Sequence, residues 1–496
     1  MKNINQPKNW YLPKVIFSIS TVAFLFINTS CNSKESTPQT KAPNIVFLLV
    51  DDLGWNDVAC YGSTFYETPN IDRLAKEGMK FTNAYAACPV CSPTRASILT
   101  GKYPARLNIT DWIPGLDPKD RILVGTQDKH ELPLAEITLA EHFKKEGYQT
   151  AFFGKWHLGE KGFFPENQGF DINKGGHWAG QPASYFYPYK NDRKRWDVPG
   201  LEGGEDGEYL TDRLTKESVQ FIQQNKEQPF LLYLAYYNVH TPIEAKQALQ
   251  TKYEQKLKDI PVTTTPDFVD ERDARTKQKQ DNPAYAAMVQ SVDESVGNIM
   301  QQLEELNLID NTIIVFTSDN GGFTTLSPKR TAPTAVTPLR AGKGWLYEGG
   351  IRVPAIVKWA GTIPQNTTCE EPIISTDFYP TLLSMAGLPA LPTQHIDGKN
   401  IVPLLEQKDD FSRPALYWHF PHYHGSKNRP SAAIRAGDYK LIEWFEDGAV
   451  ELYNLKKDVG EQNNLATDFH EKTTELQGLL EDWRKEVGAL MPVENE

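Results

Sequence analysis

The sequence predicts an α/β protein built on a large, mainly parallel mixed sheet that is flanked by helices, with a smaller C-terminal part. Continuous apolar runs of strand length recur along the chain, and each ends in polar or ionisable residues. Stretches between them carry apolar residues at helical spacing. Alternating strands and helices are typical of parallel sheets, which bind ligands at the carboxyl ends of their strands.

The apolar runs predict buried strands at residues 44–50, 149–153, 230–236 and 312–317. Each is short and bounded by polar residues, as expected of strands covered on both faces. Amphipathic spacing predicts helices at 137–146, 214–224, 285–306 and 377–386, the last closed by Gly387.

The pattern weakens after about Ile396. Residues 432–435, 440–444 and 450–453 predict short strands around glycine-containing turns, followed by a helix at 471–487. We therefore expect a catalytic α/β domain over 44–395 and a C-terminal α+β subdomain over 396–496.

The N-terminus predicts export. Residues 1–14 carry three lysines and no acid, and the apolar run 15–27 is too short to span a bilayer comfortably. The small residues before Cys31 resemble a bacterial lipoprotein cleavage site, although Asn28 departs from the usual aliphatic residue and leaves simple secretion as the alternative. We expect a signal peptide over 1–30, a lipid on Cys31, a tether over 31–43, and a place on the bacterial cell envelope, facing the periplasm or the outside.

The charge excludes one class of partner. The formal net charge is -12, and removal of the lysine-bearing segment 1–30 makes it more negative. A protein so acidic does not bind nucleic acid through its general surface, so an anionic substrate would need positive charge confined to a pocket.

Cys91 lies just before a helix that Pro93 can open, and Arg95 follows one turn later. Free N–H groups at a helix start favour negative charge, so the cysteine could be a nucleophile, a metal ligand or a buried thiol. Cys88 imitates a redox pair with Cys91, but we interpret it as structural. Whether Cys60 and Cys369 form a disulfide is left open by the sequence.

Two strand ends supply only oxygen ligands. The predicted strand 44–50 ends in Asp51 and Asp52, and the strand 312–317 leads to Asp319 and Asn320. Converging carboxylates need a cation to offset their repulsion, and hard cations such as Ca²⁺ or Mg²⁺ prefer oxygen. The sequence therefore predicts a metal site at this edge of the sheet.

The run Cys91-Ser-Pro-Thr-Arg95, continued as Ala-Ser-Ile-Leu-Thr-Gly-Lys-Tyr-Pro, resembles the signature of the formylglycine-dependent sulfatases of the alkaline-phosphatase superfamily. Residues 432–441 resemble their C-terminal subdomain. The resemblance implies an alkaline-phosphatase-like fold and oxidation of Cys91 to formylglycine by a maturation enzyme. It also implies one Ca²⁺ per chain, held by the four oxygen-bearing residues and in contact with the formylglycine.

Further residues match the same family. Lys155 and His157 share one face of an extended segment, and Gly-Lys-Trp-His-Leu-Gly fits the family pattern. Lys343 and His240 match a family lysine and histidine. The resemblance implies that both lysines neutralise the sulfuryl oxygens, that Arg95 and His157 hold the nucleophile, and that His240 protonates the leaving alcohol.

We therefore expect hydrolysis of sulfate monoesters on a sulfated carbohydrate. We expect the substrate to be an algal polymer such as ulvan or carrageenan rather than a glycosaminoglycan, because the chain resembles sulfatases of polysaccharide-degrading bacteria. One alternative is a phosphomonoester or phosphonate hydrolase of the same superfamily. The other is a non-catalytic surface lipoprotein that binds sulfated glycan and leaves Cys91 unmodified.

A sugar-facing rim is predicted from aromatic and histidine residues. The segment 176–196 is rich in aromatics that we expect to be exposed, and a histidine-rich stretch follows residue 418. The candidate rim residues are Trp112, His177, Trp178, His419 and His422.

Overall fold

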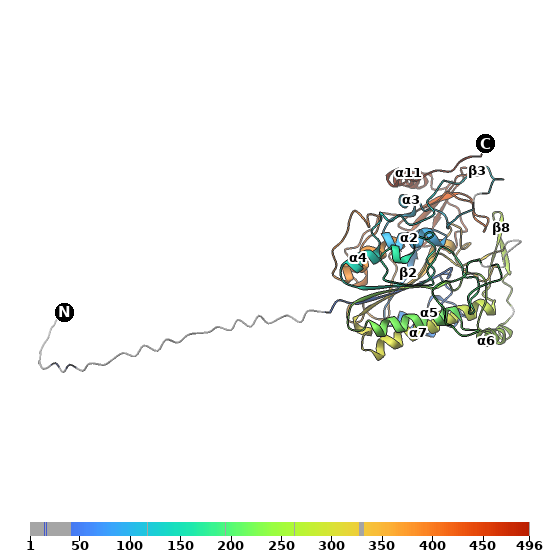
Figure 1. Cartoon of the computed structure of the whole chain (residues 1–496). Helices are drawn as coiled ribbons and strands as arrows, with labels where there is room; N and C mark the ends of the chain where they lie inside the picture. The colour runs from blue at the N-terminus through green and yellow to red at the C-terminus, as the bar shows by residue number, and fades with distance from the viewer. Residues whose placement is uncertain are drawn as a thin grey trace, which may run out of the picture. The chain divides into compact units, whose positions relative to one another are not determined.

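A nine-stranded sheet runs through the protein in the order β12-β2-β11-β9-β1-β6-β4-β5, with β13 paired to β2. The computed structural model (Figure 1) describes Lys14, Ile16 and residues 41–116, 118–193, 195–261, 263–326 and 332–495. Three predicted features lie outside the described residues: the signal peptide apart from Lys14 and Ile16, the lipidation site Cys31, and most of the tether. The sheet strands are β1 (Asn44–Val50), β2 (Met79–Tyr85), β4 (Gln149–Gly154), β5 (Ile172–Lys174), β6 (Phe230–Ala235), β9 (Thr312–Ser318), β11 (Arg352–Lys358), β12 (Thr367–Cys369) and β13 (Ile373–Ile374).

The four predicted strands form the parallel centre of this sheet. β1 pairs in parallel with β9 on one side and with β6 on the other, and β4 continues beyond β6. β11 runs antiparallel to its neighbours β9 and β2. The predicted fold class is confirmed, whereas β2 and β11 were not predicted. β2 is only half apolar, and β11 contains Pro354 at a register shift, where the lost N–H is tolerated.

Helices cover both faces of the sheet. Alternate side chains of β1 enter two separate apolar clusters: Val46 and Leu48 pack with α1, α5 and α7, and Ile45 and Phe47 pack with α2, α4 and α9. In Figure 1, α5 and α7 lie on one side of the sheet and α2 and α4 on the other. The helices are α1 (Pro69–Lys76), α2 (Cys91–Thr100), α3 (Pro104–Leu107), α4 (Leu139–Lys145), α5 (Leu210–Gln224), α6 (Gln247–Lys258), α7 (Pro283–Glu305), α8 (Glu348–Ile351), α9 (Phe378–Met385), α10 (Val402–Leu405) and α11 (His470–Val487).

The C-terminal part contains the predicted antiparallel sheet. β14 (Leu416–Phe420), β15 (Ser431–Ala436), β16 (Tyr439–Trp444) and β17 (Val450–Asn454) pair in sequence order, and α11 packs on them. Smaller pairings join β10 (Thr325–Leu326), β8 (Ala274–Lys277) and β7 (Phe268–Glu271), and join β18 (Val493–Glu494) to β3 (Leu123–Val124). The C-terminal sheet packs Trp444 against Trp345 and Trp418 against Tyr85 of the larger part. The two predicted domains therefore share one apolar cluster.

Two chemical properties of the described chain bear on the sequence analysis. Its four cysteines, at positions 60, 88, 91 and 369, are free thiols. Its helices include none with the length and apolar character needed to cross a membrane.

Helix α1 depends on a carboxylate of α7. The buried Asp293 accepts hydrogen bonds from the backbone N–H groups of Asn70 and Ile71, at 2.9 and 2.8 Å, and from the Asn70 side chain. These N–H groups open α1 and have no partner within the helix. Burial raises the pKa of Asp293 from 3.8 to about 6.

We predict a pH-dependent effect of Asp293→Asn. The raised pKa stabilises the folded state fully below pH 4, and this contribution is lost as the pH rises through 6. Because asparagine cannot ionise, the variant should be more strongly destabilised, relative to the native protein, at pH 5 than at pH 8, by about 1 kcal/mol. Urea unfolding of both proteins at the two pH values measures this; an equal difference at both would contradict it.

Candidate functional site

The oxygen-bearing residues meet at the carboxyl edge of the parallel strands. Asp51 and Asp52 follow β1, and Asp319 and Asn320 follow the neighbouring β9. One ligand oxygen from each aspartate lies within 4.8 Å of the other two, and all three side chains are buried. The backbone N–H of Asp52 donates to Asp319 Oδ1 at 3.2 Å. The register of two parallel strands thus brings together residues that are far apart in the sequence.

Three cationic side chains face the three carboxylates. Lys155 Nζ donates to Asp51 Oδ2 at 2.7 Å, and Lys343 Nζ donates to Asp52 Oδ1 at 2.6 Å. Arg95 Nε donates to Asp319 Oδ2 at 2.8 Å. Three carboxylates thus lie against three cationic groups, so the buried centre is close to electrically neutral when all three carboxylates are ionised.

The donor set fits a hard cation. Asp51 Oδ1 and Asn320 Oδ1 are buried and have no hydrogen-bond partner among the described residues, and such atoms are expected to be satisfied by a further group. Burial, opposed in part by Lys155, raises the pKa of Asp51 well above its ordinary range, so a bound cation would help to keep it ionised. Because the ligands are all oxygen, the residues suit Ca²⁺ or Mg²⁺ better than zinc.

Cys91 is the first residue of α2 rather than the residue before it. Val90 is the N-cap, and Cys91 Sγ lies 3.3 Å from His157 Nδ1. Every residue of α2 is buried, including the polar ones. Arg95 Nη1 donates to the Lys155 carbonyl at 2.6 Å, so the helix is tied to the segment after β4. Cys88 is buried and its Sγ lies 3.7 Å from the Thr110 carbonyl, in keeping with a structural role.

His157 is fixed by a backbone group that sequence reasoning could not find. Its Nε2 contacts the Ile113 carbonyl, and because a carbonyl only accepts, Nε2 carries the ring proton. Nδ1 therefore presents its lone pair to Cys91. Burial and the charge of Lys155 lower the pKa of His157 well below its ordinary value, so the ring is neutral at pH 7.

Gly180 packs directly on the His157 ring. A Cβ at position 180 would lie 2.3 Å from the ring carbon Cε1 and 2.7 Å from each ring nitrogen. Glycine is the residue that permits this approach. The segment after β5 thus covers His157 at Cε1, the ring carbon between its two hydrogen-bonded nitrogens.

His240 lies beside Asp52 of the carboxylate cluster. Its Nδ1 is 2.9 Å from the Thr241 carbonyl, to which it donates, and its Nε2 is 3.7 Å from Asp52 Oδ2. Burial and the charge of Lys343 lower the pKa of His240 well below its ordinary value. The structure thus brings together all ten residues that the sequence analysis assigned to catalysis and metal binding.

The predicted rim is only partly exposed. Trp178 is 37% exposed and Trp112 is half-buried, but His177 is buried. The exposure expected of the aromatic segment is wrong for Tyr185 and Tyr189, which are buried in the apolar core. Amphipathic tyrosines cannot be assigned to core or surface from sequence alone.

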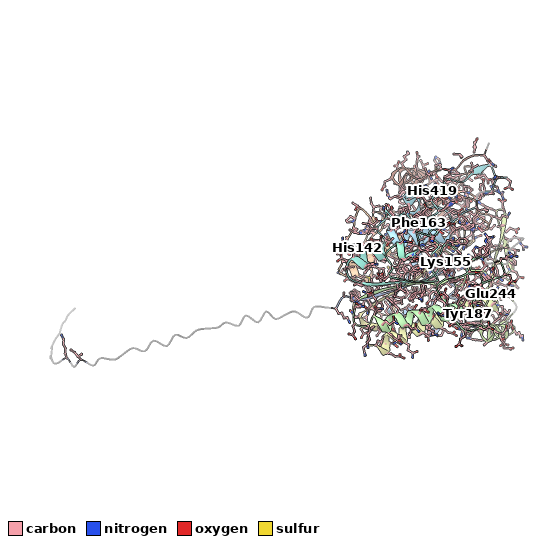
Figure 2. All side chains as sticks on the ribbon, in the orientation of Figure 1. His142, Lys155, Phe163, Tyr187, Glu244 and His419 are labelled. Carbon is pink, nitrogen blue, oxygen red and sulfur yellow. The ribbon has the colours of Figure 1, made fainter. Side chains whose placement is uncertain are left out.

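The two rim histidines of the C-terminal part are also buried. His419 Nε2 contacts the Leu490 carbonyl at 2.8 Å, and His422 Nε2 contacts Thr110 Oγ1 at 2.8 Å. Burial lowers their pKa values to about 4 and about 3. In the view of Figure 2, His419 lies apart from Lys155 and nearer α11. An exposed histidine rim is therefore not formed by these two residues.

The chain matches known proteins over most of its length. Residues 43–388 match the family model described as Sulfatase, and residues 341–486 match that of the N-sulphoglucosamine sulphohydrolase C-terminal region. A sulfatase of Formosa agariphila is 32% identical over 88% of this chain and 87% of its own length. The N-acetylgalactosamine-6-sulfatase of Rattus norvegicus is 32% identical over 88% of this chain and 78% of its own.

Solved structures agree with the family assignment. The crystal structure of Ps i-CgsB is similar with a TM-score of 0.72 and 29% identity, covering 89% of this chain and 93% of that chain. A structure of Ps i-CgsB in complex with k-i-k-neocarrahexaose gives a TM-score of 0.71 and 30% identity over the same shares. The chain thus belongs to the sulfatase family and is a sulfuric ester hydrolase.

Proposed function

We propose that Cys91 is oxidised to formylglycine and that the hydrated aldehyde is the nucleophile of this sulfatase. The observation that carries the proposal is the contact of Cys91 Sγ with the unprotonated Nδ1 of His157, beside a buried cluster of three carboxylates and three cations. A hydroxyl of the hydrate at this position would donate to Nδ1, which orients the other hydroxyl for attack.

The proposed reaction has two steps. One hydroxyl of the hydrate loses its proton to solvent, and its oxygen attacks the sulfur of the ester in line. The bond from sulfur to the ester oxygen breaks, the leaving oxygen takes a proton from His240, and the sugar leaves as an alcohol. In the second step the remaining hydroxyl gives its proton to His157 Nδ1, the aldehyde re-forms, and sulfate leaves with the oxygen that attacked. Water then hydrates the aldehyde again, so no water molecule needs to attack sulfur.

Lys155, Lys343 and His240 act on the ester itself. Both lysines are buried beside the cluster and would stabilise charge on the sulfuryl oxygens. His240 would protonate the leaving oxygen. Lys343 lowers the pKa of His240, and the arriving sulfate adds negative charge that raises its proton affinity.

We propose Ca²⁺ as the bound metal, held by Asp51, Asp52, Asp319 and Asn320 together with the formylglycine. When bound, it supplies positive charge that polarises the sulfuryl group and favours ionisation of the nucleophile. Since the protein charges already balance, a divalent cation would leave the centre positive, which suits an anionic ester. The surplus charge would be confined to this pocket of an acidic protein.

The proposed substrate is an algal sulfated polysaccharide or its oligosaccharides, with carrageenan or ulvan ahead of glycosaminoglycans. Support comes from Ps i-CgsB, which is similar to this chain and has a structure in complex with k-i-k-neocarrahexaose. The similarity to N-acetylgalactosamine-6-sulfatase keeps glycosaminoglycans as the competing class. We further propose that a lipid on Cys31 holds the enzyme on the cell envelope, which mass spectrometry of the mature N-terminus would test.

The first prediction from the proposed function concerns activity and substrate class together. Protein matured with a formylglycine-generating enzyme should release sulfate from carrageenan or ulvan oligosaccharides, measured by ion chromatography. Cys91→Ala should fold and release none, because it lacks the nucleophile. Comparable activity of Cys91→Ala would end the formylglycine proposal. Release from chondroitin or heparin fragments, with none from algal oligosaccharides, would show that the competing substrate class is correct.

The second prediction concerns the metal. Asp319→Ala removes a ligand and the partner of Arg95, so calcium content and sulfate release should both be lost, as measured by elemental analysis and turnover. Asp270→Ala, an acidic residue whose side chain is 91% exposed on β7, should keep both. Stoichiometric zinc without calcium in the native protein would point instead to a phosphatase-type centre.

The third prediction uses the close approach at Gly180. Gly180→Ala should displace the His157 ring and lower kcat by about a hundredfold, because a displacement of about 1 Å has that effect on an aligned catalytic group. Gly478→Ala, where a Cβ on α11 meets open space, should keep native activity. Native turnover in Gly180→Ala would show that the placement of His157 is not required.

A further inference from the structure

His177 lies at the catalytic edge of the sheet without a role in the chemistry described above. It follows β5 and is 4% exposed. Its carbonyl accepts a hydrogen bond from the backbone N–H of His157 at 3.1 Å. On its other side, its ring Nδ1 lies 3.0 Å from the hydroxyl of Tyr237, which follows β6. The residue therefore fills the space between the segments that carry His157 and His240.

The hydrogen bonds of this ring fix its tautomer. The Tyr237 hydroxyl is 2.8 Å from the Gly175 carbonyl and must donate to it, because a carbonyl only accepts. The Tyr237 oxygen is then left as an acceptor for Nδ1–H, as is the Gly175 carbonyl at 3.3 Å. Nε2 consequently carries the lone pair. Burial lowers the pKa of His177 to about 4, so the ring is neutral at pH 7.

This Nε2 has no hydrogen-bond partner among the described residues. A buried acceptor without a partner is unfavourable and calls for a donor from elsewhere. The feature alone does not identify a ligand, because Nε2 of His142 and Nδ1 of His419 are also buried and unpartnered. These two lie on α4 and β14, apart from Lys155 in Figure 2. His177 differs because its carbonyl accepts the backbone N–H of His157, so it lies beside the candidate site.

We propose that Nε2 of His177 accepts a hydrogen bond from a hydroxyl group of the sugar ring that bears the scissile sulfate. The proposal rests on the proposed function and narrows its substrate. A neutral acceptor binds a hydroxyl and disfavours a second sulfate or a carboxylate at the same position. The sugar therefore carries a free hydroxyl next to the sulfate that is removed. Trp178, whose ring centroid is 6.2 Å from that of His177 and which is 37% exposed, offers a face for the same sugar.

The experiment compares two substrates in matched variants of the matured enzyme. 4-Nitrophenyl sulfate has no sugar hydroxyl, whereas the sulfated oligosaccharide cleaved best by the native enzyme has one. His177→Asn keeps a donor near Nδ1 and removes the acceptor at Nε2; His177→Gln returns an oxygen close to the Nε2 position. We expect His177→Asn to lower kcat/KM for the oligosaccharide by about 10- to 100-fold more than for the aryl ester, and His177→Gln to recover part of that difference.

Two controls separate contact with the sugar from support of the fold. His142→Asn removes another buried, unpartnered Nε2 and should not lower kcat/KM for either substrate. Thermal unfolding of every variant is measured to check that the fold is kept. An oligosaccharide lacking the neighbouring hydroxyl should be cleaved equally by the native enzyme and His177→Asn. An equal loss on both substrates would overturn the proposal and make His177 a support for His157. Failure of the native enzyme to cleave any sulfated sugar, despite turnover of the aryl ester, would instead overturn the carbohydrate assignment and this proposal with it.

Discussion

The site depends on a buried balance of charge. Three buried aspartates at adjacent strand ends repel one another, and burial together with the charges of Asp319 and Asp52 raises the pKa of Asp51. Arg95, Lys155 and Lys343 offset them at hydrogen-bond distance. Removing one member of such a set leaves a buried charge uncompensated, which costs about 3–5 kcal/mol. The cationic side chains that allow the three carboxylates to be buried are therefore the same groups that face the substrate in the proposed reaction.

The C-terminal part contacts the segment of the larger part that carries Lys343. Backbone hydrogen bonds join Lys343 to the Gly322 carbonyl and Gly344 to the Pro89 carbonyl, so the segment lies between the metal and nucleophile loops. Farther along, Glu348 bonds to Lys440 of β16 at 3.0 Å, and both are fully buried. The smaller sheet thus holds the segment that carries Lys343 by an ion pair as well as by the shared apolar cluster.

The sequence was most informative where the hydrophobic pattern of a segment agrees with what the parallel sheet requires of it. The four central strands and the proximity of the ten candidate site residues could be predicted, because buried parallel strands are continuously apolar and deliver polar groups at one edge. β2 and β11 were missed, because half-buried alternation and Pro354 weaken that pattern. The contacts of His157 with the Ile113 carbonyl and Gly180 could not be predicted, since a backbone group has no side-chain signature. Tyr185 and His419 were misplaced because amphipathic residues are compatible with both core and surface.

The complete burial of α2 determines whether oxidation of Cys91 must come before or after folding. Cys91 is 3% exposed, and no residue of its helix reaches the surface. A second enzyme that oxidises Cys91 must bind the peptide around it, and the folded protein does not present that peptide. Formylglycine, if formed as proposed, is therefore installed while the chain is still unfolded. A molecule that folds before Cys91 is oxidised keeps the thiol. The fraction of active enzyme then depends on the rate of maturation relative to the rate of folding.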